Sequence, residues 1–147
     1  MNYKKFGPDY VLRLDRGEEI VETILKFVRE SKLRLGAISG LGACDLVELG
    51  IFKVAEQKYY PNRFEGEMEM TSLIGNISEM EGKPYLHLHA NFGREDGSVV
   101  GGHLNSGRIS ATAEIFIHGL EGSLDRFHDS ELGLNRLAFS EDKEEGK

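Results

Sequence analysis

Three histidines between positions 87 and 103 are the residues best suited to chemistry. The segment Tyr85–Phe92 alternates apolar and polar residues, which is the period of a half-buried β-strand. Side chains of a strand point alternately to its two faces, so one face is apolar. The apolar face carries Leu86, Leu88, Ala90 and Phe92, and the other carries Tyr85, His87, His89 and Asn91. Two imidazoles therefore share one face.

The turn after this strand decides where the third histidine lies. Glu95–Gly97 suits a three-residue hairpin loop with glycine in the left-handed position. Counting back from this loop sets His103 directly opposite His89, with Cβ atoms about 4.5 to 5.5 Å apart. His87 then lies diagonally on the same face. A two-residue loop would shift the register by one and turn His103 to the other face, so the metal hypothesis also predicts the turn.

This arrangement predicts a metal site. Three neutral imidazoles with an open fourth position are the ligand set of catalytic zinc, and nickel, iron or manganese would also fit it. We therefore expect His87, His89 and His103 to bind zinc, or another divalent transition metal, with one ion per chain. The alternative is that His87 and His89 are exposed polar residues of a half-buried strand and that His103 is a turn residue.

A carboxylate is expected near such a site, either as a fourth ligand or to hold an imidazole N–H. Glu114, in the next predicted strand, is the first candidate and the one catalytic candidate, with Glu48 and Glu69 behind it. Gly101 and Gly102 are expected to leave space for a water or a ligand.

Other candidate residues have simpler explanations. Cys44 begins an apolar run and is expected in the core rather than as a nucleophile. Gly40-Leu41-Gly42 lacks the third glycine of a dinucleotide fingerprint. His118 and His128 stand outside the cluster, with no partner that the sequence identifies.

Hydrophobic periodicity predicts one main helix and several strands. From Glu18 to about Ser31 apolar residues recur at helical spacing, with glutamates in the first turn, where the helix dipole favours negative charge. Short apolar runs and alternating segments predict strands. These are Tyr10–Asp15, Leu35–Ser39, Cys44–Phe52, Gln57–Tyr60 (ended by Pro61), Met68–Ile77, Tyr85–Phe92, Val99–Leu104, Ala111–Ile117 and a further strand around Leu132–Phe139.

Length and composition predict one domain over residues 1–140 and a charged, disordered tail at 141–147. A single cysteine excludes an intrachain disulfide and fits a reducing compartment. With no apolar stretch of signal-peptide or membrane-spanning length, we expect a cytoplasmic protein and no membrane partner. The formal net charge of -7 disfavours nucleic acid as a partner. The nearest basic cluster (Lys26, Arg29, Lys32 and Arg34) follows a predicted helix and fits a solvated face.

Five segments resemble one known family in unbroken order over about residues 9 to 118. They are Leu12–Ser31, Gly36–Cys44, Phe64–Ser78, Leu86–Leu104 (LHLHANFGREDGSVVGGHL) and Thr112–Ile117. They are similar to the PPC domain, the plants and prokaryotes conserved domain also called DUF296. The histidine and GGHL segments resemble its stand-alone prokaryotic branch, whose members are often described as PD1-like DNA-binding proteins.

The resemblance implies an α/β (α+β) fold with a mixed, largely antiparallel sheet, similar to acetolactate decarboxylase, and a homotrimer. It implies that His87, His89 and His103, which match the family's H-x-H and GGH motifs, are metal ligands. It also implies DNA binding, which the acidic charge opposes.

Three functions follow as hypotheses. The first is a metal-binding, homotrimeric protein with a regulatory or ligand-sensing role, in which DNA is a further partner. The second is a metal-dependent enzyme, lyase-like or hydrolytic, in which the metal polarises a carbonyl or activates water of a small oxygenated substrate. The third is an interaction domain with a structural metal.

Overall fold

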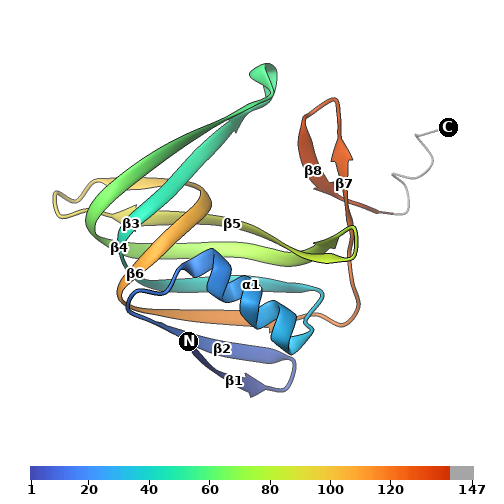
Figure 1. Cartoon of the computed structure of the whole chain (residues 1–147), viewed down its shortest axis with the longest axis horizontal. Coiled ribbons are helices and arrows are strands. Elements are labelled where there is room, and N and C mark those ends of the chain that lie inside the picture. Colours follow the sequence, from blue (N-terminus) through green and yellow to red (C-terminus); the bar gives the residue numbers. More distant parts are fainter. Residues whose placement is uncertain (140–147) are drawn as a thin grey trace.

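The computed structural model describes residues 1–139, so the predicted tail at 141–147 lies outside the described residues. Figure 1 shows one helix on a curved sheet and a separate two-stranded hairpin near the C-terminal end. The elements in chain order are β1 (Asn2–Phe6), β2 (Asp9–Asp15), α1 (Ile20–Ser31), β3 (Gly36–Lys53), a 3-10 turn η1 (Val54–Glu56), β4 (Lys58–Met80), β5 (Lys83–Gly93), β6 (Val99–Gly119), β7 (Arg126–Asp129) and β8 (Leu134–Leu137).

The main sheet has six strands in the order β1-β2-β6-β3-β4-β5. Strand β5 also pairs with β6, so β3, β4, β5 and β6 form a closed ring of paired strands. All strand pairs among the described residues are antiparallel. The predicted largely antiparallel sheet with one main helix is therefore confirmed.

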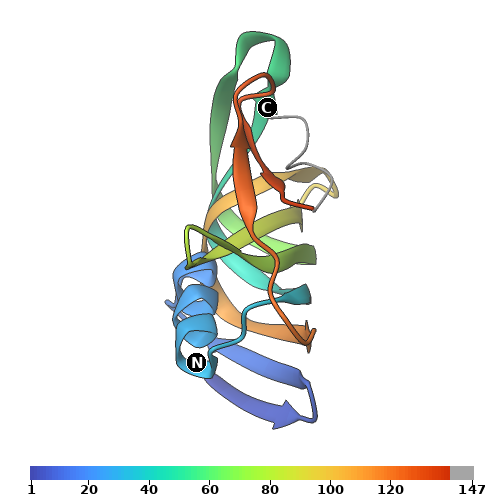
Figure 2. The same cartoon turned by 90° about the vertical axis from the view of Figure 1, so that its right-hand side faces the viewer.

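Helix α1 covers one face of the sheet, as Figure 2 shows. Its buried side chains are Ile20, Ile24, Phe27 and Val28, which belong to one hydrophobic core with the strands. The helix begins two residues later than predicted because Glu19 is its N-cap and accepts a hydrogen bond from the backbone N–H of Glu22 at 2.6 Å. Within residues 1–139 no helix has the length and apolarity that a membrane crossing requires.

Three long strands each join two strands that were predicted separately. Residues 36–39 and 44–52 of these predictions fall in β3, 58–60 and 68–77 in β4, and 99–104 and 111–117 in β6, so only Leu35 and Gln57 lie just outside. The pairing of β3 shifts register between Gly40 and Gly42 and again between Cys44 and Leu46. Such β-bulges bend a strand without ending it, which is why glycine did not mark the strand ends here.

The prediction that Pro61 ends a strand is wrong. Pro61 pairs with Gly50 of β3, while β5 joins the other edge of β4 only from Glu69 onward. Strand β4 has no partner on that edge at Pro61, so the N–H that proline lacks is not needed for strand pairing there.

The short terminal strands carried little sequence signal. Strand β1 is exposed at all of its residues, so it lacks the alternation that predicts a strand. Strand β7 was not predicted, and β8 (Leu134–Leu137) is shorter than the predicted stretch. These last two strands form a hairpin that stands across from the projecting ends of β3 and β4 (Figure 1).

Gly75 allows β4 and β5 to approach closely beside the histidines. A Cβ atom on Gly75 would lie 2.1 Å from the backbone oxygen of His87, whereas one on Gly93 would meet nothing closer than 3.4 Å.

We therefore expect Gly75→Ala to lower the free energy of unfolding by about 1–3 kcal/mol through overpacking. Gly93→Ala, in β5 itself, is the matched control. Equal stability of the two variants in denaturant titrations would contradict this account.

Candidate metal centre

The turn between β5 and β6 has the predicted three-residue loop. The backbone N–H of Arg94 donates to the oxygen of Ser98 at 2.9 Å, and Gly97 has a φ of +80°. Asp96 stabilises the loop by accepting from the backbone N–H of Ser98 at 2.9 Å. The pairing that follows sets His89 opposite His103, as predicted.

The faces of β5 also agree with the alternation of its sequence. Leu88, Ala90 and Phe92 are buried, His89 is exposed and His87 is half-buried. His103 is half-buried and lies between two strands, because β6 pairs with β5 on one side and with Gly50 of β3 on the other. The closed ring of strands therefore brings the third imidazole to the other two.

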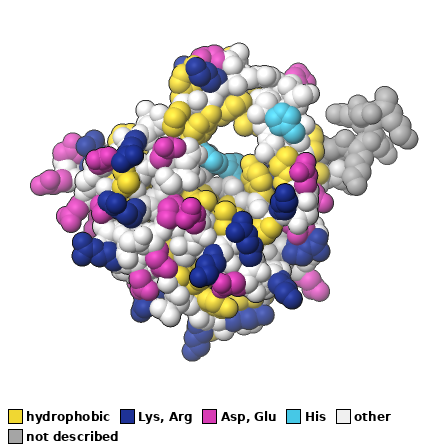
Figure 3. Space-filling view, in the orientation of Figure 1, with side chains coloured by type: hydrophobic (Ala, Val, Ile, Leu, Met, Phe, Trp, Pro, Cys, Tyr) yellow, Lys and Arg dark blue, Asp and Glu magenta, His cyan; other side chains and the backbone are white. Residues whose placement is uncertain are grey.

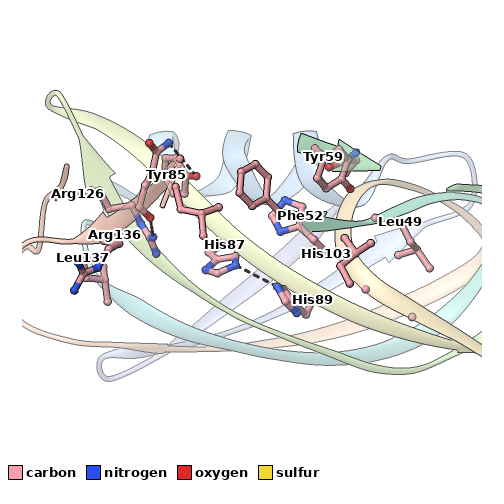
Figure 4. A pocket seen from close by; sticks show the side chains of 18 of the residues that line it. Leu49, Phe52, Tyr59, Tyr85, His87, His89, His103, Arg126, Arg136 and Leu137 are labelled. Carbon is pink, nitrogen blue, oxygen red and sulfur yellow. Dashed lines mark hydrogen bonds between the residues drawn. The ribbon is translucent and has the colours of Figure 1, made fainter. Parts of the chain in front are cut away.

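The three imidazoles converge on one point. One ring nitrogen from each of His87, His89 and His103 lies within 4.8 Å of the others. The Nε2 atoms of His87 and His89 are 3.2 Å apart, and Figure 4 shows these rings beside His103. Ring centroids are separated by 5.0 to 5.6 Å.

This donor set fits a tetrahedral metal ion. Zinc bonds to histidine nitrogen of 2.0–2.1 Å at tetrahedral angles place two ligand nitrogens about 3.3 Å apart. The 3.2 Å separation of the two Nε2 atoms agrees with that geometry. The three histidines are the group of potential metal ligands found among residues 1–139.

Burial keeps two of the imidazoles neutral. The pKa of His87 falls to about 4, first because of burial and then because of the neighbouring His89, His103 and Arg126. Burial, with a smaller contribution from His89, also lowers the pKa of His103. Their ring nitrogens therefore keep lone pairs at neutral pH, and a metal ligand needs that form.

The histidines open into a cavity of about 1310 Å³. Figure 3 shows this part of the molecule hollowed, with histidine side chains at the hollow. One wall comes from the end of β3 and the start of β4, the floor from β5 and β6, and the opposite wall from the β7–β8 hairpin. The cavity thus joins segments that are far apart in the sequence.

Tyr59 packs against the metal centre from the β4 wall. Its ring lies 6.0 Å from that of His103 and over Gly50, where a Cβ would be 2.0 Å from the Tyr59 hydroxyl. The hydroxyl is buried and has no hydrogen bond of good geometry among the described residues. Burial raises the pKa of Tyr59, which nearby Asn105 partly offsets, so the hydroxyl stays a donor.

Gly101 and Gly102, just before His103, line the cavity. They do not leave the predicted free space for a water or a ligand, because other atoms lie close to both. A Cβ on Gly101 would lie 2.0 Å from Asn91 Oδ1, and a Cβ on Gly102 would lie 2.7 Å from the backbone oxygen of Gly50. Their role is to let β6 pass close to its neighbours.

None of the three candidate carboxylates lines the cavity. Glu114 pairs with Leu41 and Arg13, far along β6 from His103. Glu69 is exposed and pairs with Gly93. Glu48 comes nearest, since it accepts a hydrogen bond of 2.9 Å from the Nδ2 atom of the cavity residue Asn105.

The two other histidines and Cys44 each have a defined environment in the structure. His118 pairs with Asp9 at 2.5 Å, away from the cluster. His128 lines the cavity, and its Nδ1 lies 3.0 Å from Asn135 Oδ1. Cys44 is fully buried, as predicted, and burial raises its pKa to about 12, so its thiol is inert.

Sequence reasoning missed the residues that the distant walls supply, above all Tyr59 and Arg126. Neither belongs to a motif. Tyr59 lies near the start of the long strand β4 and Arg126 begins the short strand β7, and neither position carries a periodic signal that points at a site. Their contribution arises only when the two hairpins stand across the histidines.

Comparison with known proteins gives a consistent result. The Plants and Prokaryotes Conserved (PCC) domain model matches residues 1–121. A candidate DNA-binding protein from Bacteroides thetaiotaomicron is 34% identical, with a TM-score of 0.92 over 94% of this chain and 96% of that one. A metal-containing protein from Archaeoglobus fulgidus is 30% identical, with a TM-score of 0.85 over 95% and 99%.

Acetolactate decarboxylase from Bacillus subtilis subspecies spizizenii shares the fold at 18% identity, with a TM-score of 0.59 over 95% of this chain and 65% of that one. The predicted similarity of fold to this enzyme is therefore confirmed. No curated protein matches the chain.

Proposed function

The chain belongs to the Plants and Prokaryotes Conserved (PCC) domain family, and from this premise we propose that it is a metal-dependent ligand-binding protein. His87, His89 and His103 hold one divalent transition metal ion, zinc in the first place, in a single cytoplasmic domain. The ion supplies a Lewis acid that attracts an oxygen atom of a small molecule in the cavity. The role of the protein is ligand sensing or regulation.

The mutual distance of the three ring nitrogens, all within 4.8 Å, is the observation that carries this proposal. Structural zinc sites have four protein ligands, whereas this group offers three donors among residues 1–139. A cavity of about 1310 Å³ over the open side leaves room for a ligand. A structural metal, the third hypothesis, is therefore less well supported.

The enzyme hypothesis remains second. A carboxylate beside the metal would favour it, but the cavity residues of the described chain include no aspartate or glutamate. The lining is better suited to holding a ligand than to proton transfer by a carboxylate.

Zinc binding should depend on each of the three histidines. We expect one zinc ion per chain by elemental analysis, and a loss of affinity of roughly 100-fold or more in each of His87→Ala, His89→Ala and His103→Ala. Removing an outer-shell partner of a metal ligand already costs 10–100-fold, so removing a ligand costs at least as much.

His118→Ala is the matched control for these variants, because His118 is exposed and pairs with Asp9 on another part of the sheet. It should keep the affinity of the unchanged protein. Zinc binding that survives in all three cluster variants, or that falls equally in the control, would refute the metal centre.

A homotrimer is the second part of the proposal. The sheet face opposite α1 exposes Leu41, Ile74 and Phe116, whose relative exposures are 55%, 60% and 53%. Ser39 pairs with both Ile74 and Phe116, and Ile74 pairs with His89, so these side chains share the face of the metal centre. An apolar face of this kind is typical of an assembly surface.

We expect the native mass to be three times the chain mass of 16.5 kDa. Phe116→Glu should shift it toward the single chain, because the charge would have to be buried in the interface. Leu120→Glu is the control, since Leu120 is also exposed but lies beyond the end of β6. Light scattering that finds one chain in the unchanged protein rules out the trimer.

We expect this chain to bind DNA weakly, although a similar protein is described as DNA-binding. The chain is acidic, at -7, and the basic cluster near α1 is partly neutralised. Arg34 donates two hydrogen bonds to Glu79, at 2.9 and 2.6 Å, and Lys26 lies 4.0 Å from Glu30.

We expect duplex DNA to bind no more tightly than the weak end of non-specific complexes, with a Kd of roughly 10⁻⁴ M at physiological salt. Fluorescence anisotropy of a labelled duplex at low and physiological salt measures this. Submicromolar binding that weakens steeply with salt would move the function from the cavity to DNA.

A further inference from the structure

Arg126 is a buried cation at the edge of the cavity. Its relative exposure is 9%, and it lies beyond residues 1–121, the part that the family model matches. Its guanidinium donates to Ser78 Oγ at 2.8 Å, to the backbone oxygen of Asn135 at 2.8 Å and to Asn76 Oδ1 at 2.9 Å. These acceptors are all neutral, and no carboxylate within residues 1–139 forms an ion pair with Arg126.

The guanidinium lies next to the metal centre. Asn76, which accepts one of its hydrogen bonds, pairs directly with His87 across β4 and β5. Ser78 pairs in the same way with Tyr85, whose ring lies 4.6 Å from the guanidinium carbon. Opposed side chains have Cβ atoms about 4.5 to 5.5 Å apart, so Arg126 is within about one side-chain length of His87. Figure 4 shows Arg126 beside Tyr85, with the histidines following toward Tyr59.

A buried positive charge in this position favours the binding of an anion. Arginine stays charged in proteins, and a buried charge is costly unless it is paired. The three hydrogen bonds use three of its five N–H groups, which leaves one on each terminal nitrogen. Two N–H groups are what a carboxylate takes from arginine in a bidentate pair.

The rest of the lining sets the charge of the ligand. Arg136 also lines the cavity, but its Nη1 atom lies 2.7 Å from a carboxylate oxygen of Asp129. One guanidinium without a carboxylate partner matches a ligand group that carries one negative charge.

We infer that Arg126 is the anion-binding residue of the cavity, and that the ligand is a small organic acid whose carboxylate meets Arg126 while a second oxygen atom reaches the histidine centre. This inference rests on the proposed function. It adds the chemical class of the ligand and a residue that binds it.

Glycolate and its neutral isostere glycolamide are the probes for this inference. Both carry a hydroxyl next to the carbonyl carbon, and only glycolate carries the negative charge. Titrations followed by NMR chemical shifts should show that the unchanged, zinc-loaded protein binds glycolate at least tenfold more tightly than glycolamide. Equal affinities for the two probes would overturn the inference without any variant.

Arg126→Gln tests the residue itself. It should bind glycolate at least tenfold more weakly than the unchanged protein and should reduce the preference over glycolamide to what the metal ion alone provides, and Arg126→Lys should recover part of the lost preference. Arg63→Gln is the matched control, because it removes one positive charge from β4 at an exposed ion pair with Glu65. Undiminished glycolate affinity in a folded Arg126→Gln protein would overturn the assignment.

The same titrations in metal-free protein separate this inference from the proposed function. Zinc content reports on the histidines alone. If the protein takes up no zinc, the proposed metal centre fails, and an Arg126-dependent preference for glycolate in the metal-free protein would still support the anion site. If zinc binds but charge makes no difference to affinity, the anion site fails and the metal centre stands.

Discussion

The hydrogen-bonded register between β5 and β6 is the constraint on which the candidate site depends. The Arg94–Ser98 closure places His89 opposite His103, and the side-chain period of two then puts His87 on the same face. A slip of one residue would send His103 into the core and break the cluster. The register is held from both sides, because β6 pairs with β3 at the same residue, where Gly50 opposes His103.

Close packing of backbone supports that register. Gly75 lets β4 approach the carbonyl of His87, and Gly102 lets β6 approach the carbonyl of Gly50. Removing side chains at these points brings the strands near enough for the imidazole nitrogens to fall within 4.8 Å of one another. The glycines therefore act on the site through strand spacing, although neither carries a group that reacts.

The electrostatics of the cavity differ from those of the molecule as a whole. The chain carries a net charge of -7, yet the cavity joins the neutral imidazoles of His87 and His103 to a buried arginine whose hydrogen-bond acceptors are all neutral. Because function belongs to a site rather than to a fold, this contrast says more about the protein than its similarity of fold to a decarboxylase. The charge of the cavity is the reason for proposing a small anionic ligand rather than the phosphate backbone of DNA.

The amino-acid sequence by itself determined the local pattern of the histidine hairpin. Alternation in residues 85–92 assigned the faces, and Glu95–Gly97 fixed the turn, because both depend on neighbouring residues along the chain. The same kind of local signal located α1 and the buried Cys44. It placed strand ends wrongly at glycines and at Pro61, since bulges and unpaired edges are properties of strand pairing.

Tertiary structure alone decided the surroundings of the histidines. Arg126 and Tyr59 reach the cavity from hairpins at opposite walls, and Glu114, the carboxylate that the sequence favoured, lies elsewhere on β6. Such contacts join residues far apart in the chain, and no local periodicity encodes them. The sequence thus determined which side chains could bind a metal, and the folding of distant strands decided what stands beside them.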